Sequence, residues 1–349
     1  MKMTFRIAVM TIVGGGSLWI LKSLGILDLR PFQEAFRREW PWIGLIILSL
    51  LGLSLVGAVR SYFLTRTLGF SAPFRDVLAV NLVGQAVGQW LPGSSAMTEV
   101  LRFGMMSGWS ADAGPAADGA VFGSKGRLGL ALLVDRVLGL GAMFAVGGLA
   151  GFIVLFRGGA GGGFFAAILA LSAISLALGL VALAAPFRPN RLLHRPAPPA
   201  AGMESGPAPK NMFRRTAWEI RRLLETLKEI RAQKNRAAGL ILLSLAAAGL
   251  NPLTLYFASQ AAGRPLPFPV ILAAIPFTIA AVFLPLGIAG FGGPQLLAAG
   301  VFSLFGADPG TVVAACLLQN TVVLAIQTLG GGIGLILPTQ RFFFRRRLI

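Results

Sequence analysis

The chain has 349 residues, of which 55% are hydrophobic and only 13% are charged, and its formal net charge is +18. An ordinary soluble domain has about 25% charged residues, so this composition indicates a membrane protein, in which excess Lys and Arg mark the cytoplasmic side rather than a nucleic-acid surface. The single cysteine and single histidine exclude an intrachain disulfide and metal sites built on these ligands.

Six apolar runs are long enough to cross a membrane, because a transmembrane helix needs about 20 mostly apolar residues. In chain order they are 7–26, 41–59, 128–156, 163–187, 237–259 and 311–337. The first run follows a short basic start and lacks a clear small-residue cleavage site, so we expect an uncleaved signal anchor.

Two further apolar regions contain a break. Region 77–107 is interrupted at Leu91-Pro92, and region 267–306 is interrupted at Leu284-Pro285 and again at the glycine turn 290–294. Each region could be two spans or a re-entrant helical hairpin. If both are re-entrant and the N-terminus is inside, 24 Lys and Arg residues, those of segment 60–75 among them, lie on the cytoplasmic side and five outside. This count favours hairpins, although the second region is long enough to cross outright.

These segments form an internal repeat. The first copy is 41–59, 77–107 and 128–156, and the second is 237–259, 267–306 and 311–337. The two hairpins would enter from opposite sides, as in the inverted repeats of many transporters. The alternative is that Leu-Pro pairs and glycine clusters recur by chance. We predict an all-α polytopic integral membrane protein with about six spanning helices plus two re-entrant helical hairpins in an inverted repeat.

The two halves, 1–187 and 237–349, are joined by a basic segment, 188–236, that holds 12 of the 31 Lys and Arg residues. Its beginning is rich in Pro and Ala, which is typical of disorder. Residues 212–232 have an apolar face and a basic face, which predicts an amphipathic helix on the inner leaflet. We therefore expect one transmembrane domain over 1–349, in the inner membrane, with both termini in the cytoplasm.

Four charged residues lie in or beside the apolar segments. Asp135 and Arg136 fall within 128–156, where a charge at the helix centre costs about 2.5–3.5 kcal/mol and usually faces a cavity or a partner. Glu99 and Arg102 are three residues apart, on one face of the first hairpin. We predict the pairs Arg136–Glu99 and Asp135–Arg102. The alternative places Asp135 and Arg136 at the cytoplasmic interface, with Arg136 reaching toward water.

Side-chain amides mark both halves. Asn81, Gln85 and Gln89 recur every four residues, so they share one stripe of a helix. They could line a hydrated path or a headgroup pocket, or form hydrogen bonds between helices. Asn320 and Gln327 on the last span could face the same cavity.

The glycine turn of the second hairpin is a candidate anion site. Gly290, Gly292 and Gly293 precede Pro294 and Gln295. Glycines permit a sharp turn, and proline suits the start of a helix. A helix N-terminus there would present free N–H groups to an anionic group. The alternative is a simple tight turn.

Several landmarks occur in a recognisable order. They are Arg60-Ser61-Tyr62, Leu91-Pro92-Gly93, Glu99-Val100-Leu101-Arg102, Asp135-Arg136-Val137, Leu284-Pro285 with the glycine turn, and Leu329-Gly330-Gly331. With them the chain resembles the transmembrane-region family of lysylphosphatidylglycerol synthetases, whose stand-alone members are flippase-like. The resemblance implies lipid binding and transfer between leaflets. The aminoacyl-transferring domain of full-length relatives is not found in this sequence, so lipid aminoacylation is not expected.

Two positions depart from that family. Relatives tend to have Arg-Glu after the glycine turn, where this chain has Pro294 and Gln295. Their last span often carries an arginine where Asn320 stands. If those charges bind headgroups in relatives, the second half of this protein handles a different substrate or has lost that role.

The sequence as a whole predicts a lipid transporter. An enzyme is not expected, because no serine or cysteine has a histidine partner for nucleophilic catalysis. It would bind a polar or anionic membrane lipid, with Arg102 and Arg136 on the phosphate. We expect no cofactor, metal or nucleic acid. Two alternatives stay open: a non-transporting accessory that presents lipid carriers to a separate glycosyltransferase, and a small-solute transporter.

Overall fold

The computed structural model describes residues 39–67, 70, 72–91, 94–107, 124–157, 165–184, 234–282, 287–288 and 291–337, and three isolated positions before these. Within these ranges the regular secondary structure is helical apart from two strands of two residues each. The expected signal anchor at 7–26 and the expected amphipathic helix at 212–232 lie outside the described residues, Ser23 apart.

Five long helices are apolar enough to cross a membrane. They are α3 (Trp40–Thr67), α6 (Ser124–Phe156), α7 (Phe165–Ala184), α9 (Lys234–Ala261) and α12 (Pro309–Ile336). Their apolar spans are 20 to 28 residues long, which is about 30–42 Å of helix against about 30 Å of hydrocarbon. Five of the predicted spans are therefore confirmed, and the protein is a multi-pass membrane protein.

The apolar outer surface of the bundle suits this environment. Leu48, Leu51 and Leu55 of α3 are all more than half exposed, as is Leu178 of α7. A helix that is apolar on every side is stable only in a protein core or in lipid.

Four shorter helices fill the two regions that the sequence predicted to be broken. They are α4 (Phe74–Trp90), α5 (Ser94–Met106), α10 (Phe268–Val282) and α11 (Gly293–Leu304). With 12 to 17 residues, none reaches the length of a typical span. Between α10 and α11, β1 (Gly287–Ile288) pairs antiparallel with β2 (Phe291–Gly292), a small ladder that the sequence did not predict.

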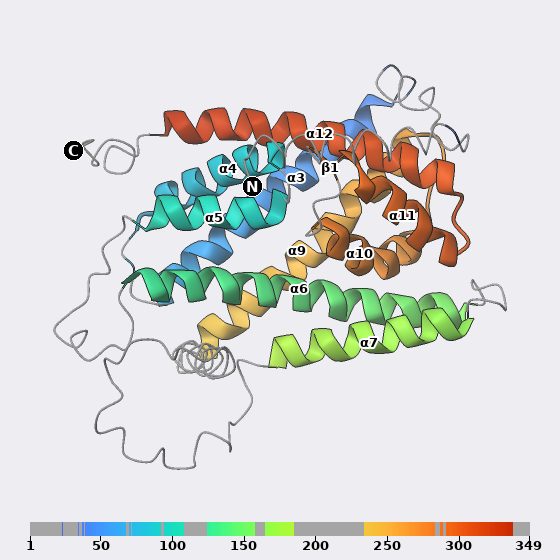
Figure 1. Cartoon of the computed structure of the whole chain (residues 1–349), viewed down its shortest axis with the longest axis horizontal. Coiled ribbons are helices and arrows are strands. Elements are labelled where there is room, and N and C mark those ends of the chain that lie inside the picture. The colour runs from blue at the N-terminus through green and yellow to red at the C-terminus, as the bar shows by residue number, and fades with distance from the viewer. Residues whose placement is uncertain are drawn as a thin grey trace, which may run out of the picture.

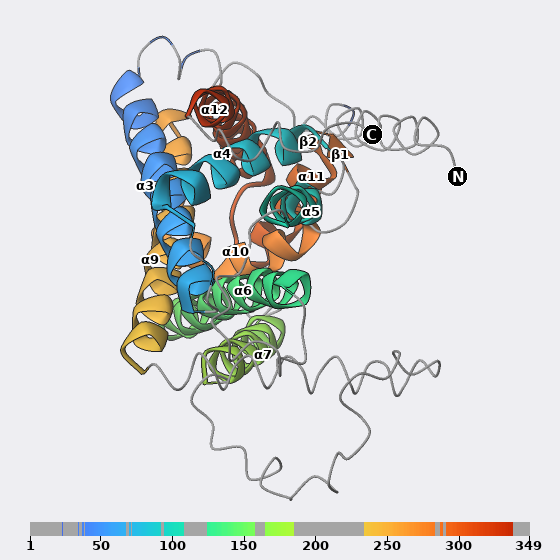
Figure 2. The same ribbon diagram turned by 90° about the vertical axis from the view of Figure 1, so that its left-hand side faces the viewer.

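The two pairs of short helices lie at opposite ends of the bundle (Figure 1). α4 packs on the C-terminal half of α12, where a Cβ at Gly334 would meet the carbonyl oxygen of Ala79 at 3.0 Å. α11 packs on the N-terminal half of α12, where Val313 and Ala299 share an apolar cluster. Figure 2 shows α4 and α5 between α12, α3 and α6, with α7 on the outer side of α6.

Two apolar cores match these two ends. One core joins Leu64, Val77, Met106 and Leu128 at the end with α4 and α5. The other surrounds Phe302, which is fully buried, at the end with α10 and α11. Polar side chains are thereby left to the space between the two cores.

Candidate functional site

A cavity of about 430 Å³ lies between the two cores, bordered by every described helix except α7. Its volume falls in the range of small-ligand pockets, about 300–1,000 Å³. The lining contains three arginines, one aspartate and eight asparagine or glutamine residues among mainly apolar side chains.

Asp135 of α6 forms the most buried part of a charged cluster in the cavity wall. Arg60 Nε lies 2.6 Å from Asp135 Oδ1, and Arg102 Nη1 lies 3.6 Å from Asp135 Oδ2. Arg60 Nη1 also donates to Ser244 Oγ of α9 at 3.3 Å. The side chain of Asp135 is 4% exposed, so its charge is compensated by the guanidinium groups rather than by water.

Glu99 of α5 holds the other two contacts of the cluster. Arg102 Nη1 donates to Glu99 Oε1 at 2.8 Å, and Arg136 Nε donates to the same oxygen at 2.8 Å. Arg102 Nη2 also donates to Ser61 Oγ at 2.5 Å. The side chain of Arg136 is 35% exposed, whereas that of Arg102 is 4% exposed. Arg136 therefore has the most exposed side chain of the three arginines.

Both predicted pairs are present, but the main partner of Asp135 differs from the prediction. Arg136 contacts Glu99 as expected, while Arg102 is a more distant partner of Asp135 than Arg60 is. The apolar pattern predicted a span that ends at residue 59, with Arg60 in the loop that follows. This predicted end was wrong, because α3 continues to Thr67 and carries Arg60 into the bundle. The apolar Phe63-Leu64 pair beyond Arg60 was the available signal. The burial of Asp135 shows that its carboxylate is paired within the bundle and does not point into solvent.

The amide stripe of α4 faces the cavity, since Asn81, Gln85 and Gln89 all line it. The neighbouring side of α4 packs on α5, and a Cβ at Gly84 would meet Arg102 Cγ at 2.8 Å. Asn81 donates to the backbone oxygen of Val77 at 2.8 Å, so it is satisfied locally.

The glycine turn forms the N-terminus of α11, whose residues Pro294 and Gln295 line the cavity. Gly292 has a φ of 104°, a region that favours glycine, and Gly293 is buried. The backbone N–H of Gly292 donates to Gln295 Oε1 at 2.6 Å. One of the N–H groups predicted to be free for an anion is therefore used within the protein. Gly290 lies outside the described residues.

On α12, Asn320 and Gln327 line the cavity as expected, and Gln319 also lines it. Gln319 donates from Nε2 to Thr254 Oγ1 of α9 at 2.6 Å. Gln319 was not predicted, because neighbouring residues on a helix point about 100° apart and only Asn320 was assigned to the cavity.

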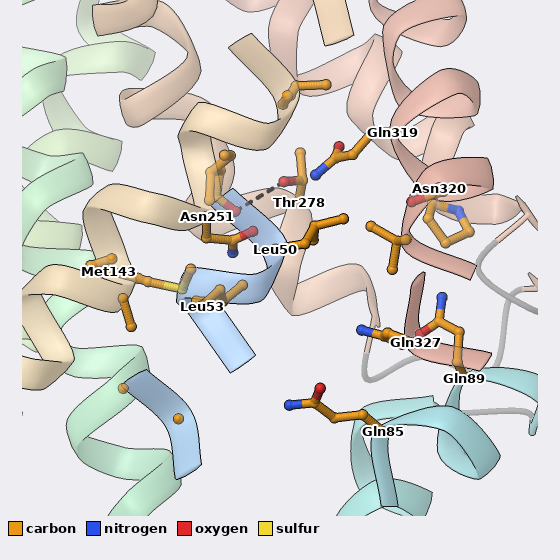
Figure 3. A pocket seen from close by; sticks show the side chains of 18 of the residues that line it. Leu50, Leu53, Gln85, Gln89, Met143, Asn251, Thr278, Gln319, Asn320 and Gln327 are labelled. Atoms are coloured by element: carbon orange, nitrogen blue, oxygen red, sulfur yellow. Dashed lines mark hydrogen bonds between the residues drawn. The ribbon is translucent and has the colours of Figure 1, made fainter. Parts of the chain in front are cut away.

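Two further lining residues were not predicted. Asn251 of α9 and Thr278 of α10 border the cavity opposite α4 (Figure 3). Each lies in a helix that also contains a proline, at Pro252 and Pro276. Neither a charge nor a regular spacing of amides marked these two positions in the sequence.

The comparison with protein families identifies the family of the chain. The model of the lysylphosphatidylglycerol synthase transmembrane region matches residues 5–331, which includes both short-helix pairs and all the residues of the charged cluster. The chain belongs to this family. The match confirms the resemblance drawn from the landmarks, and it identifies no catalytic domain. No curated protein and no solved structure gives a match to the chain.

Proposed function

We propose that this protein binds a polar or anionic lipid by its headgroup in the cavity and moves that headgroup between the two leaflets. The charged cluster carries the proposal, because three arginines face two carboxylates in a mostly apolar membrane bundle. The excess positive charge attracts an anion, and guanidinium groups suit phosphate geometry. Arg136 is the most exposed of the three and would make the first contact.

The arrangement of the short helices supports movement. In this proposal α4–α5 and α10–α11 are re-entrant hairpins that enter from opposite sides, with the two halves of the chain as inverted repeats. Their packing on opposite halves of α12 fits this arrangement. Broken helices place polar groups at mid-membrane only where these line a cavity, and small rotations of one repeat against the other expose that cavity to each side in turn.

The size of the cavity separates headgroup from acyl chains. About 430 Å³ accommodates a headgroup, and the acyl chains would stay in the bilayer. The sequence has no nucleotide-binding motif, so movement would be passive or ion-coupled. In the proposed topology the protein lies in the inner membrane with both termini in the cytoplasm.

A scrambling assay on reconstituted vesicles tests this function. Fluorescent phospholipid is placed in both leaflets, and its accessibility to an impermeant quencher is followed with wild type, Arg136→Gln and Arg66→Gln. Arg66 is the matched control, because it is exposed and contacts the ring of Tyr62 at the end of α3. Wild type and Arg66→Gln should move lipid, and Arg136→Gln should be slower by about tenfold, which corresponds to about 1.4 kcal/mol.

Three outcomes would contradict the proposal in different ways. No acceleration over empty vesicles would exclude lipid movement. Retention of a lipid class by the purified protein without any movement would instead favour an accessory that presents lipids to a separate glycosyltransferase. Equal rates for all three proteins would place the headgroup site elsewhere.

A further inference from the structure

We infer that a lipid held by its headgroup in the cavity extends its acyl chains into the bilayer through the seam between α4 and α12. A hydrogen bond between Trp90 and Thr328 closes this seam and must break before the chains can pass. This route rests on the proposed function, and it applies to a headgroup of any charge.

The wall between the cavity and the outer surface is thin at this seam. Gln89 of α4 and Gln327 of α12 both line the cavity (Figure 3). The next residue of each helix, Trp90 or Thr328, is exposed and does not line it, because neighbouring residues on a helix point about 100° apart. Trp90 Nε1 donates to Thr328 Oγ1 at 3.2 Å. This hydrogen bond therefore lies between the cavity and the outside of the bundle.

The outer surface around the hydrogen bond is apolar. Val87 of α4 is 44% exposed, and Leu329 and Ile333 of α12 are 66% and 57% exposed. Thr328 lies about 12 Å along the helix axis from the end of α12 at Ile336, at 1.5 Å per residue. The seam therefore opens into the hydrocarbon of one leaflet, which is the cytoplasmic leaflet in the proposed topology. The molecules that this surface meets are acyl chains.

The remainder of the seam is packed too closely to open. A Cβ at Gly331 would overlap Ala86 Cβ, and a Cβ at Gly334 would meet Val83 Cγ2 at 2.9 Å. Small residues allow two helix backbones to approach closely in a membrane. Because α4 ends at Trp90, its last residues lie beyond these glycine contacts. Movement of this end of α4 opens the seam and leaves the glycine contacts in place.

The closing interaction is weak enough to break each time a lipid passes. A hydrogen bond between helices in a membrane changes an equilibrium constant by a factor of about three on average. On the cavity side of the seam, Gln327 Oε1 is buried and has no hydrogen-bond partner among the described residues. A buried amide oxygen of this kind indicates a partner from water or a ligand. The inner side of the seam therefore offers an acceptor to a headgroup whose chains pass between the helices.

Two conservative variants test the closure, because each removes one side of the hydrogen bond. Trp90→Phe removes the N–H donor and Thr328→Val removes the acceptor, and both keep most of the side-chain volume. In the vesicle assay described above, each variant should move lipid about threefold faster than wild type. The double variant should be no faster than the faster single variant, since both changes remove the same interaction.

A fluorescent probe detects the acyl chains without depending on transport. Cys316→Ala removes the single cysteine, so that a bimane fluorophore can be attached at Leu53→Cys in the cavity wall. Quenching by phospholipids that carry a nitroxide on an acyl chain then reports chains that reach the cavity. This quenching should increase about threefold in both seam variants.

Trp42→Phe and Thr321→Val are the matched controls. Trp42 stacks on Phe257, and the hydroxyl of Thr321 donates to the backbone oxygen of Leu317, so neither residue closes the seam. Both variants should behave as wild type in the two assays.

The possible results separate the route from the proposed function. Lipid movement with equal rates and equal quenching in wild type and the seam variants would overturn the inference and leave the proposed function standing. Slower movement in the seam variants would also overturn it, because the hydrogen bond would then hold the route open. Increased quenching in the seam variants without lipid movement by any protein would support the route and overturn the proposed function.

Discussion

The two ends of the cavity hold their short helices in place by different kinds of interaction. At the α4–α5 end, side-chain charges from α3, α5 and α6 hold the helices together through Arg60, Glu99, Arg102, Asp135 and Arg136. At the α10–α11 end, the turn is held by backbone groups, a two-residue ladder and the amide of Gln295. The first end therefore presents charged groups to the cavity, whereas the described residues of the second end present only neutral polar groups there.

The two ends also differ in the free-energy cost of losing one of these interactions. A buried charge requires a compensating charge, so every change within the ion cluster leaves another group unpaired. A buried amide or backbone N–H requires one hydrogen bond, and its loss costs less. Variants at the α4–α5 end should consequently have larger effects on stability than variants at the α10–α11 end.

The largest effect is expected for Asp135→Asn. Removing the negative charge of Asp135 leaves the buried guanidinium groups of Arg60 and Arg102 without part of their counter-charge. Such a loss typically costs about 3–5 kcal/mol of stability. We expect a strongly lowered thermal unfolding temperature of the detergent-purified protein, measured by dye-free fluorimetry. Asp308→Asn is the control, because the Asp308 side chain is 61% exposed and asparagine also caps helices. Equal unfolding temperatures for both variants would show that the cluster has another counter-ion.

At the α10–α11 end, the largest loss of stability is expected from a substitution that disturbs helix packing. A Cβ at Gly147 of α6 would meet the backbone oxygen of Leu272 at 2.8 Å and the ring of Pro276, both in α10. Gly147→Ala should destabilise by about 1–3 kcal/mol, although alanine is the better helix former. Gly300→Ala, where the new Cβ would meet nothing within 4 Å, should instead stabilise by up to about 1 kcal/mol. The two unfolding temperatures should move in opposite directions, and a parallel shift would contradict this packing.

Sequence patterns were sufficient where a strong local signal existed. Apolar length gave five spans, and the proline and glycine breaks gave both pairs of short helices. The Arg136–Glu99 pair followed from the high cost of an unpaired charge in an apolar segment.

Non-local compensation was not visible in the same way. A hydropathy reading ends a span at the first charge, so Arg60 was assigned to a loop, although Asp135 compensates it from 75 residues away. The ladder β1–β2 depends on a turn whose glycine spacing allows several geometries. Asn251 and Gln319 reach the cavity only because of how α9 and α12 are rotated, which no periodic pattern records.

A smaller effect is expected for Gln295→Leu at the start of α11. The variant removes the acceptor of the Gly292 N–H in a fully buried position, and an unsatisfied buried donor costs about 1–3 kcal/mol. Hydrogen exchange at Gly292 and the first turn of α11 should become faster, while α5 should be unaffected. Gln260→Leu serves as the control, because Gln260 belongs to α9 and not to the first turn of α11. Unchanged exchange at Gly292 would mean that another group accepts this hydrogen bond.

The smallest effect concerns a charge outside the cavity, Asp308, which caps α12. Its Oδ2 accepts from the backbone N–H and the hydroxyl of Thr311, at 2.8 and 2.7 Å, and these hydrogen bonds keep the pKa of Asp308 below its usual range. Asp308→Ala should cost about 1 kcal/mol. A lowered pKa means that the stabilisation is complete above about pH 4 and disappears as the pH falls through the folded-state pKa. The unfolding temperatures of wild type and Asp308→Ala should therefore converge in acid.

A companion variant at this cap sharpens the comparison between charges inside and outside the cavity. Arg264 lies 3.6 Å from Asp308, the same separation as that between Arg102 and Asp135. The side chains of the first pair are 51% and 61% exposed, and those of the second are each 4% exposed. Water screens the exposed pair, so Arg264→Gln should change the free energy of unfolding by less than about 0.5 kcal/mol. Arg102→Gln should lower it markedly, because burial and not distance decides what an ion pair contributes.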